Sequence, residues 1–296
     1  MNKMRIQFAD FWGGFDPRDN FWTMLLDRLS VPYEVVDDDS DLLVASCFGV
    51  SHPGRRSRRR MYWTGENWYR MDDRLGHLGG SATLEMFDMV YSFDLGDHPN
   101  HYRLPLYLVD TIESGIRDYN AVARRLSRDE LRAKFGSKGF CTFVQANGGS
   151  QFRNSYFKAL NGISLVDSYG PLFNNTGLVL GRAEKVKKAA EYKFQMSFEN
   201  SQYAGYITEK IVDAIKSDVI PIYWGGSIKD EFNTDAIIDV NELGVEASLD
   251  LVRRMKDDFD LYWHHYDQPI IRPGQAPLGR RIEDFLAHFE NFINSV

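Results

Sequence analysis

Short apolar runs that end at turn residues alternate with amphipathic helical patterns along most of this chain. The runs at residues 4–9 and 33–36 are predicted to be strands, and residues 21–29 between them have helical spacing of their apolar side chains. Further strand-like runs lie at residues 42–46, 60–64 and 89–92. This alternation predicts an α/β fold built on a mostly parallel sheet.

A second βαβ-rich domain is predicted to begin after residue 135. Residues 127–139 are dominated by Arg, Lys, Asp, Glu and Gly, and we place the domain boundary there. Beyond it, strands are predicted at residues 140–145, 193–198 and 219–224, and helices at 154–160, 184–191 and 207–217. The predicted domains are residues 1–135 and 136–273.

Residues 274–296 are predicted to form an amphipathic C-terminal helix. Its apolar stripe consists of Ile282, Phe285, Leu286, Phe289, Phe292 and Ile293. We expect this helix to pack back on the body of the protein, and membrane or partner binding is the alternative.

Composition narrows the class of protein. The 296 residues suffice for two domains, and 14% aromatic residues supply more apolar surface than a disordered chain carries. A net charge of −7 argues against general nucleic-acid binding. Two cysteines, Cys47 and Cys141, cannot form a disulfide framework, and no apolar run approaches the roughly 18 residues of a membrane span. We therefore expect a cytoplasmic protein, with at most peripheral contact at the inner membrane face.

The densest cluster of polar and aromatic side chains occupies residues 198–210. It follows a predicted strand and leads into a predicted helix, and ligands of α/β sheets bind beyond the carboxyl ends of the strands. The helix N-terminus offers free N–H groups to a phosphate, Lys210 adds a positive charge, and Glu209 is suited to a ribose diol. Exposed, solvated charges are the alternative for both residues.

A second polar loop, at residues 147–154, also follows a strand and opens a helix. Its Arg153 could clamp a pyrophosphate in bidentate fashion, and simple surface exposure is the alternative. Two such loops in one domain together predict a nucleotide-diphosphate site.

A carboxylate follows the strand-like run at residues 60–64. Glu66 stands beside Gly65 at the strand end, where it could act as a general base. A turn or helix-capping acid is the alternative interpretation.

Other charged segments give weaker signals. Residues 37–41 contain Asp-x-Asp spacing, but a solvated turn explains them better than a metal site. Residues 97–101 match no standard zinc spacing, and the arginine-rich run at 55–60 is best explained as a solvated surface. Neither a dinucleotide-binding glycine fingerprint nor a P-loop is present.

Several of these segments resemble the signature of the α-1,3/4-fucosyltransferases, glycosyltransferase family ten. The matching segments are residues 64–67 (TGEN), 103–107 (RLPLY), 140–153, 198–201 (FENS), 206–210 (YITEK) and 220–225 (IPIYWG). Residues 9–14 (ADFWGG) look like the bacterial members of the family. The resemblance spans residues 4–270 in the same order along the chain.

The resemblance implies a GT-B architecture, with two Rossmann-like domains facing across a cleft. It also implies inverting transfer of L-fucose from GDP-fucose to O3 of N-acetylglucosamine, or of glucose, in a β-galactosyl acceptor such as N-acetyllactosamine. Alternatives are α-1,4-fucosyl transfer, transfer of another sugar from its nucleotide, or a GDP- or glycan-binding module without turnover. No metal or cofactor is expected to be required, and the oligomeric state stays open.

The resemblance also implies roles for individual residues. Glu66 is similar to the proposed general base. The residues similar to donor contacts are Asn147, Arg153, Asn200, Tyr206, Glu209 and Lys210. Among these, Arg153 and Lys210 would bind the diphosphate and Glu209 the ribose.

Overall fold

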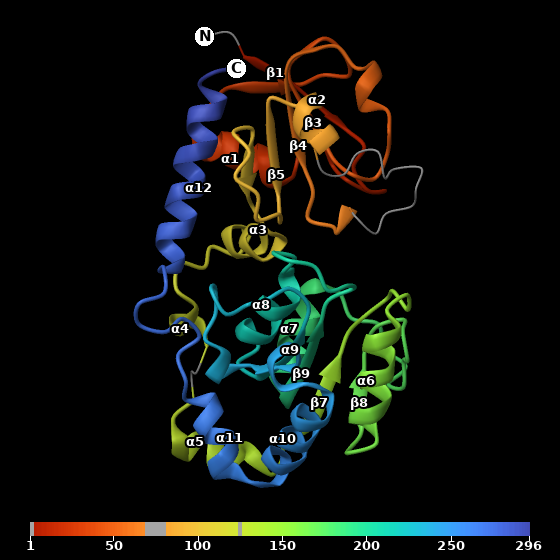
Figure 1. The fold of residues 1–296 in the computed structure, drawn as a ribbon, viewed down its shortest axis with the longest axis vertical. Coiled ribbons are helices and arrows are strands. Elements are labelled where there is room, and N and C mark those ends of the chain that lie inside the picture. The colour runs from red at the N-terminus through yellow and green to blue at the C-terminus, as the bar shows by residue number, and fades with distance from the viewer. Residues whose placement is uncertain (1–2, 69–80, 124–125) are drawn as a thin grey trace. The chain divides into compact units, whose positions relative to one another are not determined.

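The computed structural model describes residues 3–68, 81–123 and 126–296. The chain divides into two compact units. One is formed by Met1–Val109 together with Arg281–Val296, and the other by Asp110–Arg280. Each unit contains one sheet flanked by helices (Figure 1).

The first unit is built on a six-stranded sheet whose neighbouring strands all pair in parallel. In chain order the strands are β1 (Met4–Ala9), β2 (Tyr33–Val35), β3 (Ser40–Ala45), β4 (Ser57–Trp63), β5 (Met89–Ser92) and β6 (His101–Arg103). The helices of its chain are α1 (Phe21–Arg28), α2 (Ser81–Met86), α3 (Leu106–Glu113), which continues into the second unit, and most of α12 (Leu278–Ile293). In space the strands are ordered β2-β1-β3-β4-β5-β6.

The second unit contains a five-stranded sheet that is also parallel throughout. Its strands are β7 (Gly139–Phe143), β8 (Val166–Ser168), β9 (Tyr192–Phe198), β10 (Ile220–Trp224) and β11 (Ile238–Asp239). Its helices are α4 (Tyr119–Val122), α5 (Arg128–Phe135), α6 (Gln151–Asn161), α7 (Arg182–Ala189), α8 (Glu209–Lys216), α9 (Val240–Leu243), α10 (Val245–Asp257) and α11 (Phe259–Tyr266). In space the strands are ordered β11-β10-β9-β7-β8.

Both sheets have the same doubly wound strand order. In each, the first strand lies between the second and the third, so the chain crosses to one side of the first strand and then to the other. The point at which the direction of these crossovers reverses is the switch point of the sheet. This switch point lies between β1 and β3 in the first unit and between β7 and β9 in the second. In open α/β sheets, ligands bind in the crevice that opens there, beyond the carboxyl ends of the strands.

The charged stretch at residues 127–139 forms a helix of the second unit instead of the predicted boundary. Helix α5 begins with a capping box in which Ser127 and Glu130 satisfy each other's backbone N–H groups. Its apolar residues Leu131 and Phe135 are buried in the core of the second unit. The charged residues of this stretch therefore form the exposed face of α5. The two units divide between residues 109 and 110 instead.

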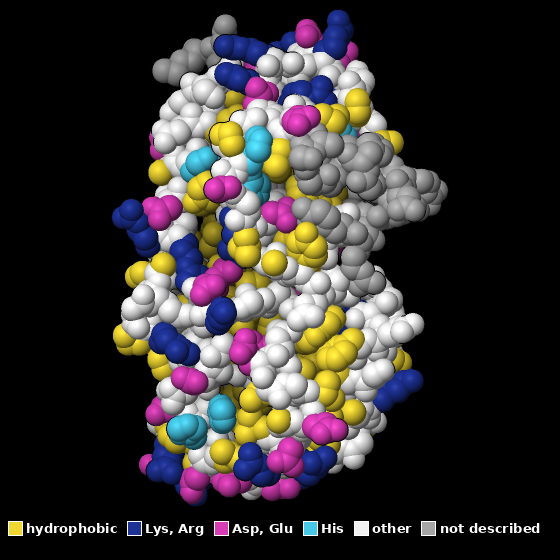
Figure 2. Space-filling model, viewed as in Figure 1, with side chains coloured by type: hydrophobic (Ala, Val, Ile, Leu, Met, Phe, Trp, Pro, Cys, Tyr) yellow, Lys and Arg dark blue, Asp and Glu magenta, His cyan; other side chains and the backbone are white. Residues whose placement is uncertain are grey.

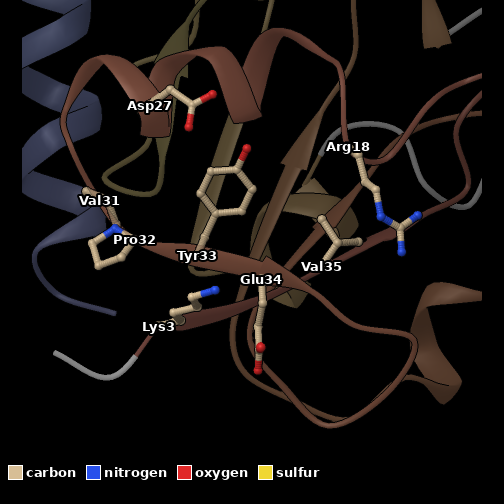
Figure 3. Close-up of a pocket in the computed structure, with 8 residues that line it drawn as sticks. All are labelled: Lys3, Arg18, Asp27, Val31, Pro32, Tyr33, Glu34 and Val35. Atoms are coloured by element: carbon tan, nitrogen blue, oxygen red, sulfur yellow. The ribbon is translucent and has the colours of Figure 1, made fainter.

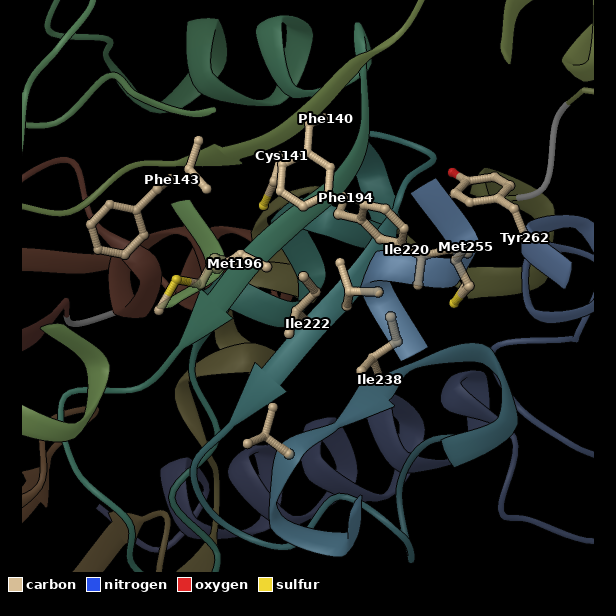
Figure 4. Packing of buried hydrophobic residues seen from close by; sticks show 14 of the residues in the cluster. Phe140, Cys141, Phe143, Phe194, Met196, Ile220, Ile222, Ile238, Met255 and Tyr262 are labelled. Atoms are coloured by element: carbon tan, nitrogen blue, oxygen red, sulfur yellow. The ribbon is translucent and has the colours of Figure 1, made fainter. Parts of the chain in front are cut away.

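The core of the second unit forms where β9 and β10 lie side by side. Phe194 pairs with Ile220 and Met196 with Ile222, and all four side chains are buried (Figure 4). Continuous apolar residues of this kind are expected for a parallel sheet covered on both faces.

Helix α12 packs on the core of the first unit, as Figure 1 shows beside α1. Phe285 is fully buried and its ring stacks on Phe21 at a centroid distance of 6.1 Å, while Phe289 lies 5.6 Å from Trp22. The apolar stripe predicted from the sequence is thus the face that contacts the sheet layer. Among the helices in the described part of the chain, none combines the length and apolar composition that a bilayer span requires.

The arginine-rich run at residues 55–60 leads into and forms part of β4, where its side chains contact acidic and carbonyl groups of their own unit. Arg59 Nη1 lies 2.7 Å from Asp88 Oδ1, and Arg60 Nη2 donates to His52 O at 2.7 Å. On the face drawn in Figure 2, basic and acidic side chains are interspersed.

Replacing Phe285 with Ala should remove buried aromatic packing from the first unit. We expect the free energy of unfolding to fall by about 3–5 kcal/mol, measured by urea denaturation. Leu286→Ala is the matched control, because the neighbouring side chain is only half-buried and should lose far less. Equal losses for the two variants would contradict this packing.

Candidate active site

Two loops of the second unit meet at its switch point. One follows β7 and contains residues 144–150, and the other follows β9 and contains residues 199–208. All six residues predicted to contact a donor lie in these loops or in the first turn of the helix that follows each. The structure thus brings the predicted nucleotide site together in one unit.

Arg153 joins the two loops. Its side chain is completely buried, and Nη1 donates to Asn200 Oδ1 at 2.7 Å, to Gln145 Oε1 at 3.3 Å and to Glu199 O at 3.4 Å. Nη2 donates to the carbonyl oxygen of Asn147. Burial places this positive charge behind both loops, and the sequence-based alternative of a surface arginine is wrong.

The loop after β7 is shaped by its own side chains. Asn147 is exposed, and its Oδ1 accepts the N–H of Gly149 at 2.7 Å. Ser150 caps α6 by accepting from the N–H of Arg153 at 3.4 Å. These contacts leave the N-terminus of α6 at the carboxyl edge of the sheet.

The loop after β9 is closed by a buried carboxylate. Glu199 is fully buried, and its two oxygens accept from the N–H and the hydroxyl of Thr208, both at 2.7 Å. A Cβ on Gly225 would overlap the Glu199 side chain and lie 2.6 Å from the hydroxyl of Tyr223, so only glycine fits there. Burial raises the pKa of Glu199, and the positive charge of Lys210 offsets only part of this rise.

The first turn of α8 carries Glu209 and Lys210. Lys210 Nζ donates to Thr208 Oγ1 at 2.9 Å and lies 3.3 Å from Glu199 Oε2 and 3.4 Å from Glu209 Oε1. Tyr206, just before the helix, is buried, and its carbonyl accepts the N–H of Gly226 at 3.2 Å. Lys210 and Glu209 therefore form a charged pair at the N-terminus of a helix that points into the switch point.

Glu209 is held in its ionised form. Desolvation raises the pKa of this carboxyl, but the charges of Lys210 and Lys185 and hydrogen bonds at the helix start outweigh it and lower the pKa to about 2. An ionised carboxylate accepts hydrogen bonds from hydroxyl groups without donating any.

Sequence reasoning missed Glu199 as the residue that organises this site, and it missed Lys185. Lys185 Nζ on α7 lies 2.5 Å from Asp213 Oδ2, and Asp213 is one turn beyond Glu209 on α8. The spacing of Glu209 and Asp213 is a weak signal, because two carboxylates four residues apart on a helix repel each other and a nearby cation relieves that repulsion.

Glu66 lies in the first unit, on the loop after β4. Its N–H donates to Thr64 Oγ1 at 3.1 Å, and that hydroxyl in turn contacts Glu66 O at 3.0 Å and Cys47 Sγ at 3.2 Å. Leu106 packs against Gly65, where a Cβ would lie 3.0 Å from Leu106 Cδ1. These contacts fix the backbone of the predicted base at the carboxyl edge of the first sheet.

A separate cavity of about 450 Å³ lies at the edge strand β2 (Figure 3). Its lining includes Lys3, Asp27, Tyr33 and Glu34, and contains none of the predicted site residues. Within residues 3–68, 81–123 and 126–296, no group of three or more His, Cys, Asp or Glu side chains is arranged to hold a metal ion.

Two family models match the chain. Residues 6–110 match "Alpha-(1,3)-fucosyltransferase FucT N-terminal domain", and residues 134–268 match "Glycosyltransferase family 10 (fucosyltransferase) C-term". Alpha-(1,3)-fucosyltransferase FucT of Helicobacter pylori is 26% identical over 90% of this chain. The chain spans 60% of the length of that relative.

Solved structures give the same result for the fold. A crystal structure of an α1,3-fucosyltransferase is 25% identical, with a TM-score of 0.74 over 99% of this chain and 90% of its own. A crystal structure of an α1,3-fucosyltransferase with GDP-fucose has 23% identity and a TM-score of 0.68, over 97% of this chain and 90% of its own. Together with the two parallel sheets, these likenesses confirm the predicted GT-B fold class. The chain belongs to glycosyltransferase family 10, the fucosyltransferase family.

Proposed function

We propose that this protein transfers L-fucose from GDP-fucose to a sugar hydroxyl. The observation that carries the proposal is the switch point of the second unit, where Lys210 and the N-terminus of α8 lie beside the loop fixed by Arg153. A cation beside a helix N-terminus is a common binding site for a nucleotide diphosphate. The names of the family models and relatives support fucose as the transferred sugar.

The charges of the side chains in these loops suggest which part of GDP-fucose each would contact. Lys210 would bind the diphosphate, and the ionised carboxylate of Glu209 would accept hydrogen bonds from the ribose hydroxyls. Arg153 is buried, so its charge would act on the diphosphate from behind the loops while it holds Asn147 and Asn200 in place. Tyr206 is buried, so it would support the same site from within the loop after β9.

The proposed reaction is a single displacement with inversion. The acceptor oxygen attacks the anomeric carbon of fucose as the bond from that carbon to GDP breaks, and the acceptor proton passes to the carboxylate of Glu66. GDP leaves with one more negative charge, which Lys210, Arg153 and the helix N–H groups would stabilise without a metal ion. Each preorganised donor of this kind typically contributes about 3 kcal/mol.

The proposed acceptor is O3 of N-acetylglucosamine, or of glucose, in a β-galactosyl saccharide such as N-acetyllactosamine. The first experiment is therefore transfer from GDP-fucose to N-acetyllactosamine in EDTA, with mass spectrometry of the product and NMR of its linkage. An α-1,3-fucosylated product supports the donor, the acceptor class and metal independence together. An α-1,4 linkage would correct the regiochemistry, and GDP binding without turnover on any acceptor would indicate a binding module.

Lys210→Ala should weaken GDP binding by roughly 10- to 100-fold, because a charge-assisted contact to the diphosphate is lost. Isothermal titration calorimetry measures this change. Lys187→Ala is the matched control, since Lys187 is an exposed lysine on α7. Lys210→Arg should recover part of the affinity, and an unchanged Kd for Lys210→Ala would refute the role.

Glu66→Gln should reduce transfer by roughly a hundredfold or more while GDP affinity stays constant, because the amide cannot accept the acceptor proton. Turnover with saturating GDP-fucose is the measurement. Glu85→Gln, at an exposed position of the same unit, should transfer at the wild-type rate. Substantial residual transfer by Glu66→Gln would assign the base to another residue.

A further inference from the structure

The first sheet has its own switch point, between β1 and β3. Where the corresponding place in the second sheet carries charged residues, this one carries aromatic side chains. Trp12 follows β1 and is 43% exposed, and Phe48 follows β3 and is 39% exposed. Their ring centroids are 5.9 Å apart in an edge-to-face arrangement.

Other aromatic rings pack against Trp12. Phe11 stacks on Phe15 at 3.9 Å, and Trp12 contacts Phe11 at 5.7 Å and Phe15 at 5.3 Å. We call Phe11, Trp12, Phe15 and Phe48 the aromatic platform. Beside Trp12, a Cβ on Gly13 or Gly14 would meet no atom of the residues that the structure describes within 4 Å.

A partly buried polar clamp holds the two loops of the platform together. Asp10 Oδ1 accepts from the N–H and hydroxyl of Ser51 at 2.9 and 2.7 Å, and Oδ2 accepts from the N–H of His52 at 2.9 Å and contacts its Nδ1 at 2.7 Å. Asp10 adopts a left-handed backbone conformation (φ 61°), and His52 is fully buried. Such a clamp fixes exposed rings in place before any ligand arrives, which lowers the entropic cost of binding.

The aromatic platform adjoins the strand end that leads to Glu66. Trp63, the last residue of β4, lies 6.3 Å from both Phe11 and Trp12. Cys47, next to Phe48, accepts from the hydroxyl of Thr64, which also binds the backbone of Glu66. A ligand seated on the platform would therefore lie next to the predicted base.

We propose that the aromatic platform is the acceptor subsite, in which Trp12 stacks against the apolar C–H face of a pyranose ring and Phe48, which stands edge-to-face to Trp12, borders that ring. This inference rests on the proposed function and adds to it the residues and the chemistry that select the acceptor. A β-galactosyl ring fits, because one of its faces presents several C–H groups while the axial O4 hydroxyl projects from the opposite face.

The charge of the two loops favours a neutral sugar over a nucleic-acid base as the ligand of the platform. Residues 10–16 and 46–52, which form the two loops, contain no lysine or arginine and include Asp10 and Asp16. Stacked nucleic acids need neighbouring cations for their phosphates. A neutral saccharide requires none.

The test uses the full chain with Trp12→Ala, Phe48→Ala and the conservative Trp12→Phe. We expect Trp12→Ala and Phe48→Ala each to raise the KM for N-acetyllactosamine roughly tenfold, while Trp12→Phe stays close to wild type. The Kd for GDP should not change, because the donor loops belong to the second unit. Leu165→Ala, at a 61% exposed leucine of that unit, is the matched control.

Saturation-transfer NMR with N-acetyllactosamine separates this proposal from the proposed function. Signals on galactose C–H protons that disappear in Trp12→Ala would support the platform even if no transfer occurs. Transfer with an unchanged KM in both alanine variants would overturn the platform and leave the proposed function intact. The proposal would also be overturned if the wild type gave no β-galactoside signal. A membrane-binding role would overturn it as well, and it would appear as sedimentation with phosphatidylglycerol vesicles that depends on Trp12 while the KM is unchanged.

Discussion

The burial of two opposite charges beneath the switch-point loops governs the form of the second unit. Arg153 and Glu199 are both inaccessible to water, and a buried ion is tolerated only when hydrogen-bonding partners surround it. Arg153 finds them in Asn147, Asn200 and neighbouring carbonyl groups, and Glu199 finds them in Thr208. The loops after β7 and β9 must follow these contacts, so the shape of the proposed donor site is set by the requirement to satisfy two buried charges.

The two units share one strand order but carry different kinds of side chain at the switch point. Each sheet reverses its winding beside its first strand, and ligands of open α/β sheets bind at such points, beyond the carboxyl ends of the strands. The second unit places charged side chains there and the first places exposed aromatic rings. This division suits the proposed reaction, in which a charged nucleotide donor meets a neutral sugar.

Prediction from sequence succeeded where the signal was local. Strands β1 and β5 begin and end at the predicted residues, because each is an apolar run bounded by turn residues and can be recognised from its own sequence. The two-residue strand β11 and the three-residue β8 are too short to give a pattern. The boundary near residue 135 was misplaced, because the charged face of α5 masks the burial of Leu131 and Phe135.

By itself the sequence determined the α/β class, the family resemblance and the loops in which chemistry should occur, since periodicity and motifs are properties of neighbouring residues. Only the tertiary structure decided that Arg153 is buried, that Glu199 closes the loop and that Trp12 and Phe48 face solvent. The physical reason is that burial depends on partners distant along the chain. Arg153 and Asn200, or Asp10 and His52, come within 2.7 Å only when parallel strands bring their loops to one edge of a sheet.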